Sequence, residues 1–132
     1  MTPGLVLAVA LGAALGAPAR FAVERRTAAT WPWGTLVVNG LGSALLGLLV
    51  GVTSVRPSTS ALVLALVGTG FCGALTTFGG FAAQLLDLAT EPRADPGSAR
   101  ALRSLAYAAA SVAGCLAIAA LGYALSQWLL GH

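Results

Sequence analysis

The sequence predicts an all-α integral membrane protein with four transmembrane helices in a single domain, residues 1–132. Its 132 residues are 58% hydrophobic and only 8% charged, far from the roughly 25% charge of soluble domains. The mean hydropathy is +0.88. Four runs without Asp, Glu, Lys or Arg are each long enough for an apolar helix to cross a bilayer, which takes roughly 17–25 residues. These runs are 1–19, 27–55, 57–86 and 104–132.

The first predicted span covers about residues 4–23. The small residues at 17–19 resemble a signal-peptide cleavage site, but the basic segment that precedes the apolar part of such a signal is missing. Gly12 and Gly16 lie four residues apart, a spacing that lets helices approach closely in lipid. We therefore expect a retained helix. Arg20 lies in its last turns, where a charge either snorkels to the headgroups or serves an anion vestibule.

The second predicted span covers about residues 34–53 and follows an aromatic Trp-Pro-Trp anchor at 31–33. Polar and small residues recur every fourth position along it, so they share one side of the helix. That side is expected to face protein or water rather than lipid. The residues are Thr35, Asn39, Ser43, Gly47 and Gly51.

The third predicted span covers about residues 60–89 and is rich in glycine near its middle, at positions 68, 70, 73, 79 and 80. Glycine weakens a helix, so this helix is predicted to be broken near its middle. Irregular backbone at membrane depth is tolerated only where protein buries it or where it lines a hydrated cavity. The segment is therefore a candidate site.

The fourth predicted span covers about residues 102–130 and carries Tyr107 and Ser111, four residues apart. No Asp, Glu, Lys or His lies in the interior of any span, since Asp87 is near the end of the third, so proton-coupled transport and acid–base catalysis lack their usual groups, and we expect no enzyme. Cys72 and Cys115 lie in apolar runs and are expected to be free thiols. Hydroxyls, one amide and glycine-freed backbone suit a small ion.

Three motifs in register resemble those of the Fluc/CrcB fluoride channel family. They are Gly12-x-x-x-Gly16-Ala17-x-x-Arg20, Gly34-Thr35-Leu36-x-x-Asn39-x-x-Gly42 and Gly70-Phe71-Cys72-Gly73-x-x-Thr76-Thr77-Phe78-x-x-Phe81. The similarity extends over essentially the whole chain. It implies an antiparallel dual-topology-type dimer with two potential pores, through which fluoride leaves the cell passively.

The resemblance also implies roles for individual residues. The backbone carbonyls of Gly73 and Thr76 would hold a structural sodium ion at the dimer centre, because a hard cation prefers oxygen ligands. Phe78 and Phe81 would turn their positive ring edges toward fluoride. Without the motifs, the glycines would fit a packing kink, and two phenylalanines three apart would fit ordinary apolar contacts.

Further polar residues would complete the fluoride pathway. Asn39 would offer its amide to the anion, and Thr77, Tyr107 and Ser111 would add polar wall, while Arg20 would concentrate anions at a vestibule. From the residues alone, Asn39 equally fits a hydrogen bond between helices.

The chain departs from the family pattern at three positions. Gly79 and Gly80 stand where the family commonly has Ser and Thr, and Gln84 stands at the position of a Glu. Because these hydroxyls are missing, the sequence leaves open whether the pore that uses this helix conducts. Two alternatives to a fluoride channel are a small four-span multidrug-type exporter, which needs a glutamate that residues 1–19 lack, and a non-transporting packing subunit.

The arginines predict one orientation in the inner (plasma) membrane. The first and third loops carry six of them and the second loop carries only Arg56. Since positive residues in short loops stay cytoplasmic, both termini should be extracytoplasmic. A fixed orientation favours a heterodimer with an oppositely oriented paralogue over self-pairing. The six arginines are Arg20, Arg25, Arg26, Arg93, Arg100 and Arg103.

Overall fold

The computed structural model describes residues 2–27, 31–90 and 97–131. All the regular structure in this part of the chain is helical. Four helical segments are long and apolar enough to span a membrane when residues 61–90 are counted as one. The prediction of an all-α protein with four such helices is confirmed. The elements are α1 (Pro3–Arg26), α2 (Trp33–Val55), α3 (Ala61–Val63), the π-helix η1 (Leu64–Cys72), α4 (Gly73–Leu75), α5 (Phe78–Thr90) and α6 (Gly97–Leu130).

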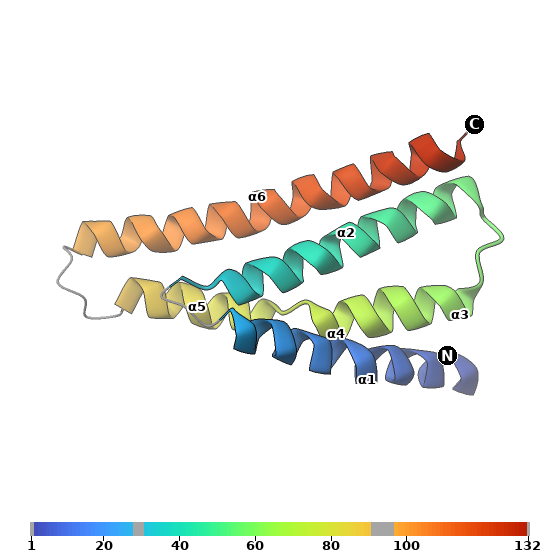
Figure 1. Ribbon diagram of the computed structural model, residues 1–132, viewed down its shortest axis with the longest axis horizontal. Helices are drawn as coiled ribbons and strands as arrows, with labels where there is room; N and C mark the ends of the chain where they lie inside the picture. The colour runs from blue at the N-terminus through green and yellow to red at the C-terminus, as the bar shows by residue number, and fades with distance from the viewer. Residues whose placement is uncertain (1, 28–30, 91–96, 132) are drawn as a thin grey trace.

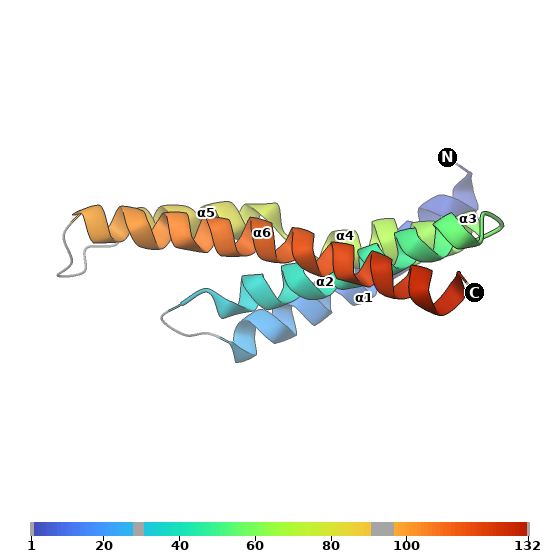
Figure 2. The same ribbon diagram turned by 90° about the horizontal axis from the view of Figure 1, so that it is seen from above.

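The helices alternate in direction along the bundle. The start of α1, the turn between α2 and α3 and the end of α6 lie toward one end of the bundle, and the end of α1, the start of α2, the end of α5 and the start of α6 lie toward the other (Figure 1). α2 packs mainly against α6, whereas α1 packs mainly against η1 and α4, and α5 packs against α6. At the end opposite the termini, α5 and α6 reach past α1 and α2 (Figure 2).

Glycines allow two close helix contacts. A Cβ atom on Gly12 would lie 2.7 Å from the Phe71 backbone nitrogen and would overlap the Leu66 carbonyl oxygen, so no other residue fits between α1 and η1. A Cβ atom on Gly47 would overlap the Ala119 carbonyl oxygen, which fixes α2 against α6 in the same way. These contacts set the register of the two helix pairs.

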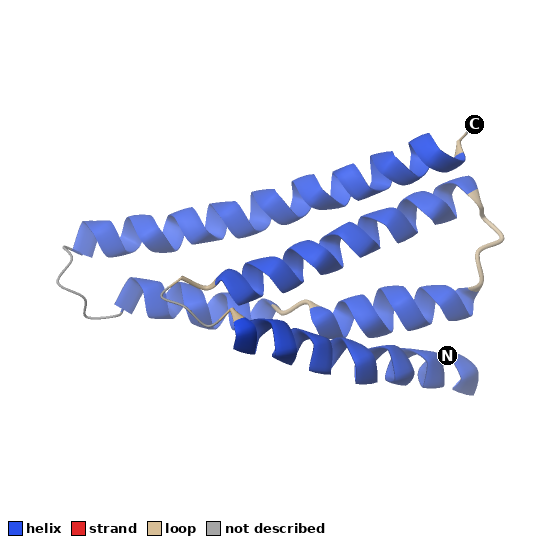
Figure 3. Cartoon of the chain, in the orientation of Figure 1, coloured by secondary structure: helices blue, strands red, loops and turns tan. Residues whose placement is uncertain are grey.

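The third span changes character twice along its length. η1 is a nine-residue π-helix, at whose end the Gly73 amide donates to the Gly68 carbonyl, five residues earlier. Thr76 is then extended (φ −79°, ψ 157°), and helical structure resumes at Phe78 (Figure 3). The direction of the span bends by only 18°. Helical structure is lost only at 76–77 and the span is not redirected, so the predicted break of this helix is not confirmed.

α6 begins at Gly97, five residues before the predicted start of the fourth span at 102. The prediction followed the apolar run, which ends at the arginines. A helix extends beyond the hydrocarbon region without needing apolar residues, so Arg100 and Arg103 lie on its first turns. Cys72 and Cys115 are free thiols, as expected.

Gly12→Ala should lower the free energy of unfolding by about 1–3 kcal/mol, the usual cost of overpacking. The measurement is thermal unfolding of the protein in detergent. Gly114→Ala is the matched control, because a Cβ atom there meets nothing within 4 Å. Equal melting temperatures for the two variants would contradict the close α1–η1 contact.

Candidate functional site

A cavity of about 420 Å³, here the main cavity, lies between α2, the third span and α6. Most of the predicted site residues line it, although they come from distant parts of the sequence. The structure thus brings together Asn39, Gly73, Thr76, Thr77, Phe78, Phe81 and Ser111. Among the described residues that line this cavity, none is charged.

Asn39 on α2 forms a reciprocal pair of hydrogen bonds with the backbone of Thr77. The Thr77 N–H donates to Asn39 Oδ1 at 2.8 Å, and Asn39 Nδ2 donates to the Thr77 carbonyl at 3.2 Å. In an uninterrupted helix the Thr77 N–H would donate to the Gly73 carbonyl. The Asn39 side chain therefore replaces the helical hydrogen bond of the Thr77 N–H. The Gly73 carbonyl is left without its usual helical donor.

Two hydroxyls close the helical ends on either side of the interruption. Thr77 Oγ1 accepts a hydrogen bond from the Gly80 N–H at 3.0 Å, which makes Thr77 the N-cap of α5. Thr76 Oγ1 donates to the Cys72 carbonyl at 2.9 Å, which also accepts from the Thr76 N–H at 3.0 Å at the end of the preceding helix.

Arg20 reaches the interruption from α1. Its Nη1 donates to the Thr76 carbonyl at 3.4 Å, and its side chain does not line the main cavity. The structure therefore places the guanidinium beside the predicted sodium ligand. The sequence motif did not indicate this contact, because it depends on the register that Gly12 and Gly16 set between α1 and the third span.

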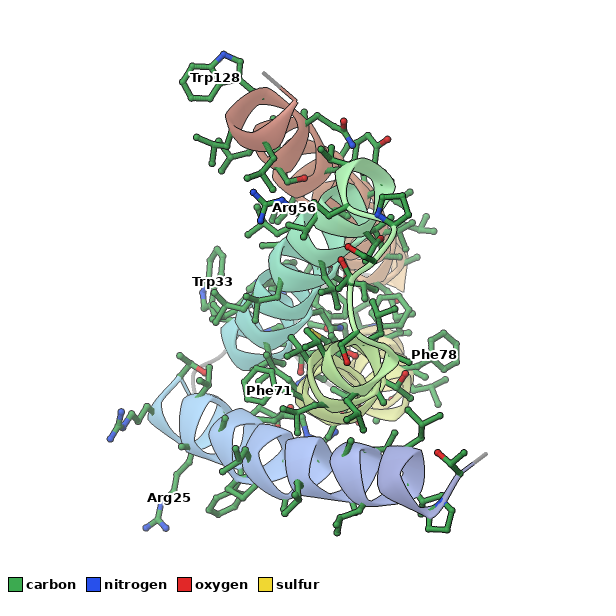
Figure 4. All side chains as sticks on the ribbon, turned by 90° about the vertical axis from the view of Figure 1, so that its right-hand side faces the viewer. Arg25, Trp33, Arg56, Phe71, Phe78 and Trp128 are labelled. Atoms are coloured by element: carbon green, nitrogen blue, oxygen red, sulfur yellow. The ribbon has the colours of Figure 1, made fainter. Side chains whose placement is uncertain are left out.

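Aromatic rings form a continuous series from the main cavity toward the first loop. The ring centroids of Phe78 and Phe81 are 5.9 Å apart, those of Phe81 and Tyr107 are 5.5 Å apart, and Trp31 meets Tyr107 edge-on at 6.0 Å. All lie within the range of favourable aromatic pairing. Phe78 is 81% exposed and points away from the helices (Figure 4). Its ring therefore lacks cover in a single subunit.

Tyr107 does not line the main cavity, although it was predicted to contribute to the polar wall. It is fully buried, and its hydroxyl donates to Gln84 Oε1 at 2.7 Å. This bond turns the hydroxyl toward a second cavity, which Gln84 lines. Ser111, one turn further along α6, is buried and does line the main cavity.

The second cavity also measures about 420 Å³ and lies between the end of α1, the start of α2 and α5. Its lining includes Glu24, Thr35, Gln84 and Asp87. Sequence analysis missed it because these residues belong to three separate segments and form no short motif. The only signal was the unusual Gln84.

The glycines at 79 and 80 differ in what they allow. A Cβ atom on Gly79 meets nothing within 4 Å, so a side chain fits there. A Cβ atom on Gly80 would lie 2.9 Å from Thr77 Cγ2 and would push the N-cap residue of α5. Gly80 therefore accommodates the observed cap, whereas Gly79 is not required by packing.

Comparison with known proteins gives one consistent result. Residues 7–123 match the family described as CrcB-like protein, Camphor Resistance (CrcB). A protein of Bordetella bronchiseptica named fluoride-specific ion channel FluC is 38% identical over 125 residues, covering 94% of this chain and 92% of the relative. Rhodococcus jostii FluC 2 is 43% identical, with 92% and 98% covered. Frankia casuarinae FluC 1 is 41% identical, with 95% and 98% covered.

Asn39→Leu should destabilise the interruption, because it leaves the Thr77 N–H unpaired at a cost of about 1–3 kcal/mol. Hydrogen exchange at the Thr77 amide should accelerate, and the melting temperature in detergent should fall. Ser43→Ala is the control, since Ser43 lines the same cavity one turn further along α2. Unchanged exchange at Thr77 would show that Asn39 does not hold this backbone.

Proposed function

This chain belongs to the CrcB family, and from that membership we propose that it is a fluoride-specific ion channel through which fluoride leaves the cytoplasm passively. It is a channel and not an enzyme. The observation that supports this function best is the main cavity, where an amide, hydroxyls and aromatic rings from three spans meet without a charged side chain in its described lining. A small anion is attracted there but is not trapped.

Fluoride would move along the ring edges of Phe78 and Phe81, whose positive rims favour an anion. Asn39 donates one of its two amide hydrogens to the Thr77 carbonyl, so the second hydrogen is left to bind the ion. The hydroxyls of Thr77 and Ser111 border the same space. In this arrangement Asn39 both holds the interruption and offers a donor.

The structural sodium ion is proposed at the carbonyls of Gly73 and Thr76. The Gly73 carbonyl suits this role because its helical donor, the Thr77 N–H, bonds to Asn39 instead. The Thr76 carbonyl accepts the long bond from Arg20 at 3.4 Å, but a carbonyl oxygen has a second lone pair for a cation. Backbone oxygens from two subunits would enclose the ion, so it would be retained rather than transported.

An antiparallel partner would complete the site. Phe78 is the most exposed of the large hydrophobic side chains in the described residues, and it stands at the edge of the main cavity. A second subunit packed against this face would cover the ring and close the open side of the pathway. The single subunit therefore supplies one wall, and dimerisation supplies the other.

The partner is proposed to be a paralogue with the opposite orientation. Arg25 and Arg26 are exposed in the last turn of α1, and Arg25 points away from the helices (Figure 4). With the arginines of the third loop they favour a cytoplasmic location for that end of the bundle. The numbered names FluC 1 and FluC 2 fit organisms with more than one such subunit. The partner would then carry the Ser, Thr and Glu that are common in the family, in place of which this chain has Gly79, Gly80 and Gln84.

Liposomes that contain the assembled protein should release fluoride but not chloride, as measured with ion-selective electrodes. Phe81→Ile should slow fluoride efflux by at least about tenfold, which corresponds to roughly 1.4 kcal/mol of barrier. Phe21→Ile is the control, since Phe21 is exposed on α1 away from the cavity. Chloride efflux at a comparable rate, or efflux that follows a sodium gradient, would refute the proposed channel.

The orientation is tested by labelling introduced cysteines in intact cells, in a background with Cys72 and Cys115 replaced by alanine. Ser58→Cys, in the second loop, should react with a membrane-impermeant reagent from outside. Thr27→Cys, after α1, should react only after permeabilisation. Equal labelling of both sites from outside would indicate two orientations and a self-pairing dimer.

A further inference from the structure

The carbonyl oxygen of Thr76 has lost its helical donor. In an uninterrupted helix it would accept a hydrogen bond from the N–H of Gly80, four residues later. That N–H donates to Thr77 Oγ1 instead, at 3.0 Å, as part of the N-cap of α5. The extended backbone of Thr76, with ψ at 157°, also turns the carbonyl out of the line of helical carbonyls. The oxygen is therefore open to groups from outside the third span.

The group that reaches this oxygen is the guanidinium of Arg20. Its Nη1 donates to the Thr76 carbonyl at 3.4 Å, and the side chain is half-buried. The contact depends on close packing one turn earlier on α1, since a Cβ atom on Gly16 would overlap the Phe71 carbonyl oxygen and would lie 3.1 Å from the Leu75 nitrogen. α1 thus holds a full positive charge against the interruption.

Arg20 contacts one of the two carbonyls proposed to bind sodium. The Gly73 carbonyl has no helical donor, whereas the Thr76 carbonyl is shared with the guanidinium. A hard cation lies about 2.4 Å from an oxygen ligand, so an ion on the Thr76 carbonyl would lie within about 6 Å of Nη1. Like charges at this separation repel strongly where little water screens them. The guanidinium therefore opposes the binding of the ion.

The position of Arg20 distinguishes this effect from the collection of anions at a vestibule. Arg20 is not among the described residues that line the main cavity, where the proposed fluoride pathway lies. Its hydrogen bond is made to the backbone of the interruption. A charge that served only to collect anions would leave the sodium affinity unchanged when it was removed.

We propose that Arg20 is a positioning residue that sets the sodium affinity of this chain. Its guanidinium holds the Thr76 carbonyl when no ion is bound, and its charge weakens the binding of the ion that shares this oxygen. The occupancy of the sodium site, and with it the stability of the assembled dimer, then depends on the Na⁺ concentration. This inference rests on the sodium site of the proposed function.

The experiment measures the thermal unfolding of the assembled protein in neutral detergent while Na⁺ replaces N-methyl-D-glucamine at constant chloride. The melting temperature should rise with Na⁺ and saturate, because an ion that binds only the folded dimer stabilises it. Arg20→Gln removes the charge but keeps an amide donor. It should lower the Na⁺ concentration that gives half of this effect by at least about tenfold.

Two further variants separate the charge of Arg20 from its packing. Arg20→Lys keeps the charge, so its half-saturating Na⁺ concentration should stay within about threefold of that of the unchanged protein. Arg25→Gln removes the same charge from the last turn of α1, where the side chain points away from the helices, and should have no effect (Figure 4). Tighter Na⁺ binding by Arg20→Gln cannot result from misfolding, which would weaken the response.

The outcomes distinguish this inference from the proposals on which it rests. An unchanged or higher half-saturating Na⁺ concentration in Arg20→Gln would overturn it, as would an equal gain in Arg25→Gln. A melting temperature that does not respond to Na⁺ in the unchanged protein would refute the sodium site and, with it, this role of Arg20. A normal Na⁺ response in a protein without any fluoride efflux would contradict the proposed channel and leave the role of Arg20 standing.

Discussion

The hydrogen-bonded pair between the Asn39 side chain and the Thr77 backbone is the interaction on which the candidate site depends. A membrane-spanning chain cannot leave backbone groups unpaired in hydrocarbon, so an interruption in a helix needs donors and acceptors from elsewhere. Asn39 supplies one of each, at 2.8 and 3.2 Å. Its amide thereby makes the extended residue Thr76 tolerable and frees the Gly73 carbonyl. The main cavity opens at this point.

The remaining structure distributes charge around that interruption, and none of the described residues that line the main cavity is charged. Arg20 approaches from α1 because Gly12 and Gly16 let α1 lie against η1 and α4. Glu24 and Asp87 gather at the far side of the Phe81–Tyr107 pair, around the second cavity. Fixed charges in the pathway would hold an ion too tightly, whereas charges beside it alter how often ions enter.

The sequence was sufficient to predict four membrane-spanning helices, because each apolar run is long enough to cross a bilayer as a helix. The motifs also identified most residues of the main cavity, since the second motif lies on α2 and the third on the third span, two of the segments that line it. The π-helix at 64–72 could not be predicted, because its glycines indicate a weak helix but not which hydrogen bonds replace the usual ones. Tyr107 was assigned to the wall by motif, yet its hydroxyl bonds to Gln84. Such side-chain choices depend on tertiary contacts that no local pattern contains.

The most direct test of this account is the fluoride efflux of liposomes that contain Asn39→Leu together with the partner subunit, compared at equal amounts of intact dimer. The account predicts that efflux falls by at least about tenfold, because the interruption loses both hydrogen bonds that Asn39 makes to Thr77 and the anion loses a donor. Efflux equal to that of the unchanged protein, from a dimer shown to be intact, would contradict the claim that the Asn39–Thr77 pair builds the pathway.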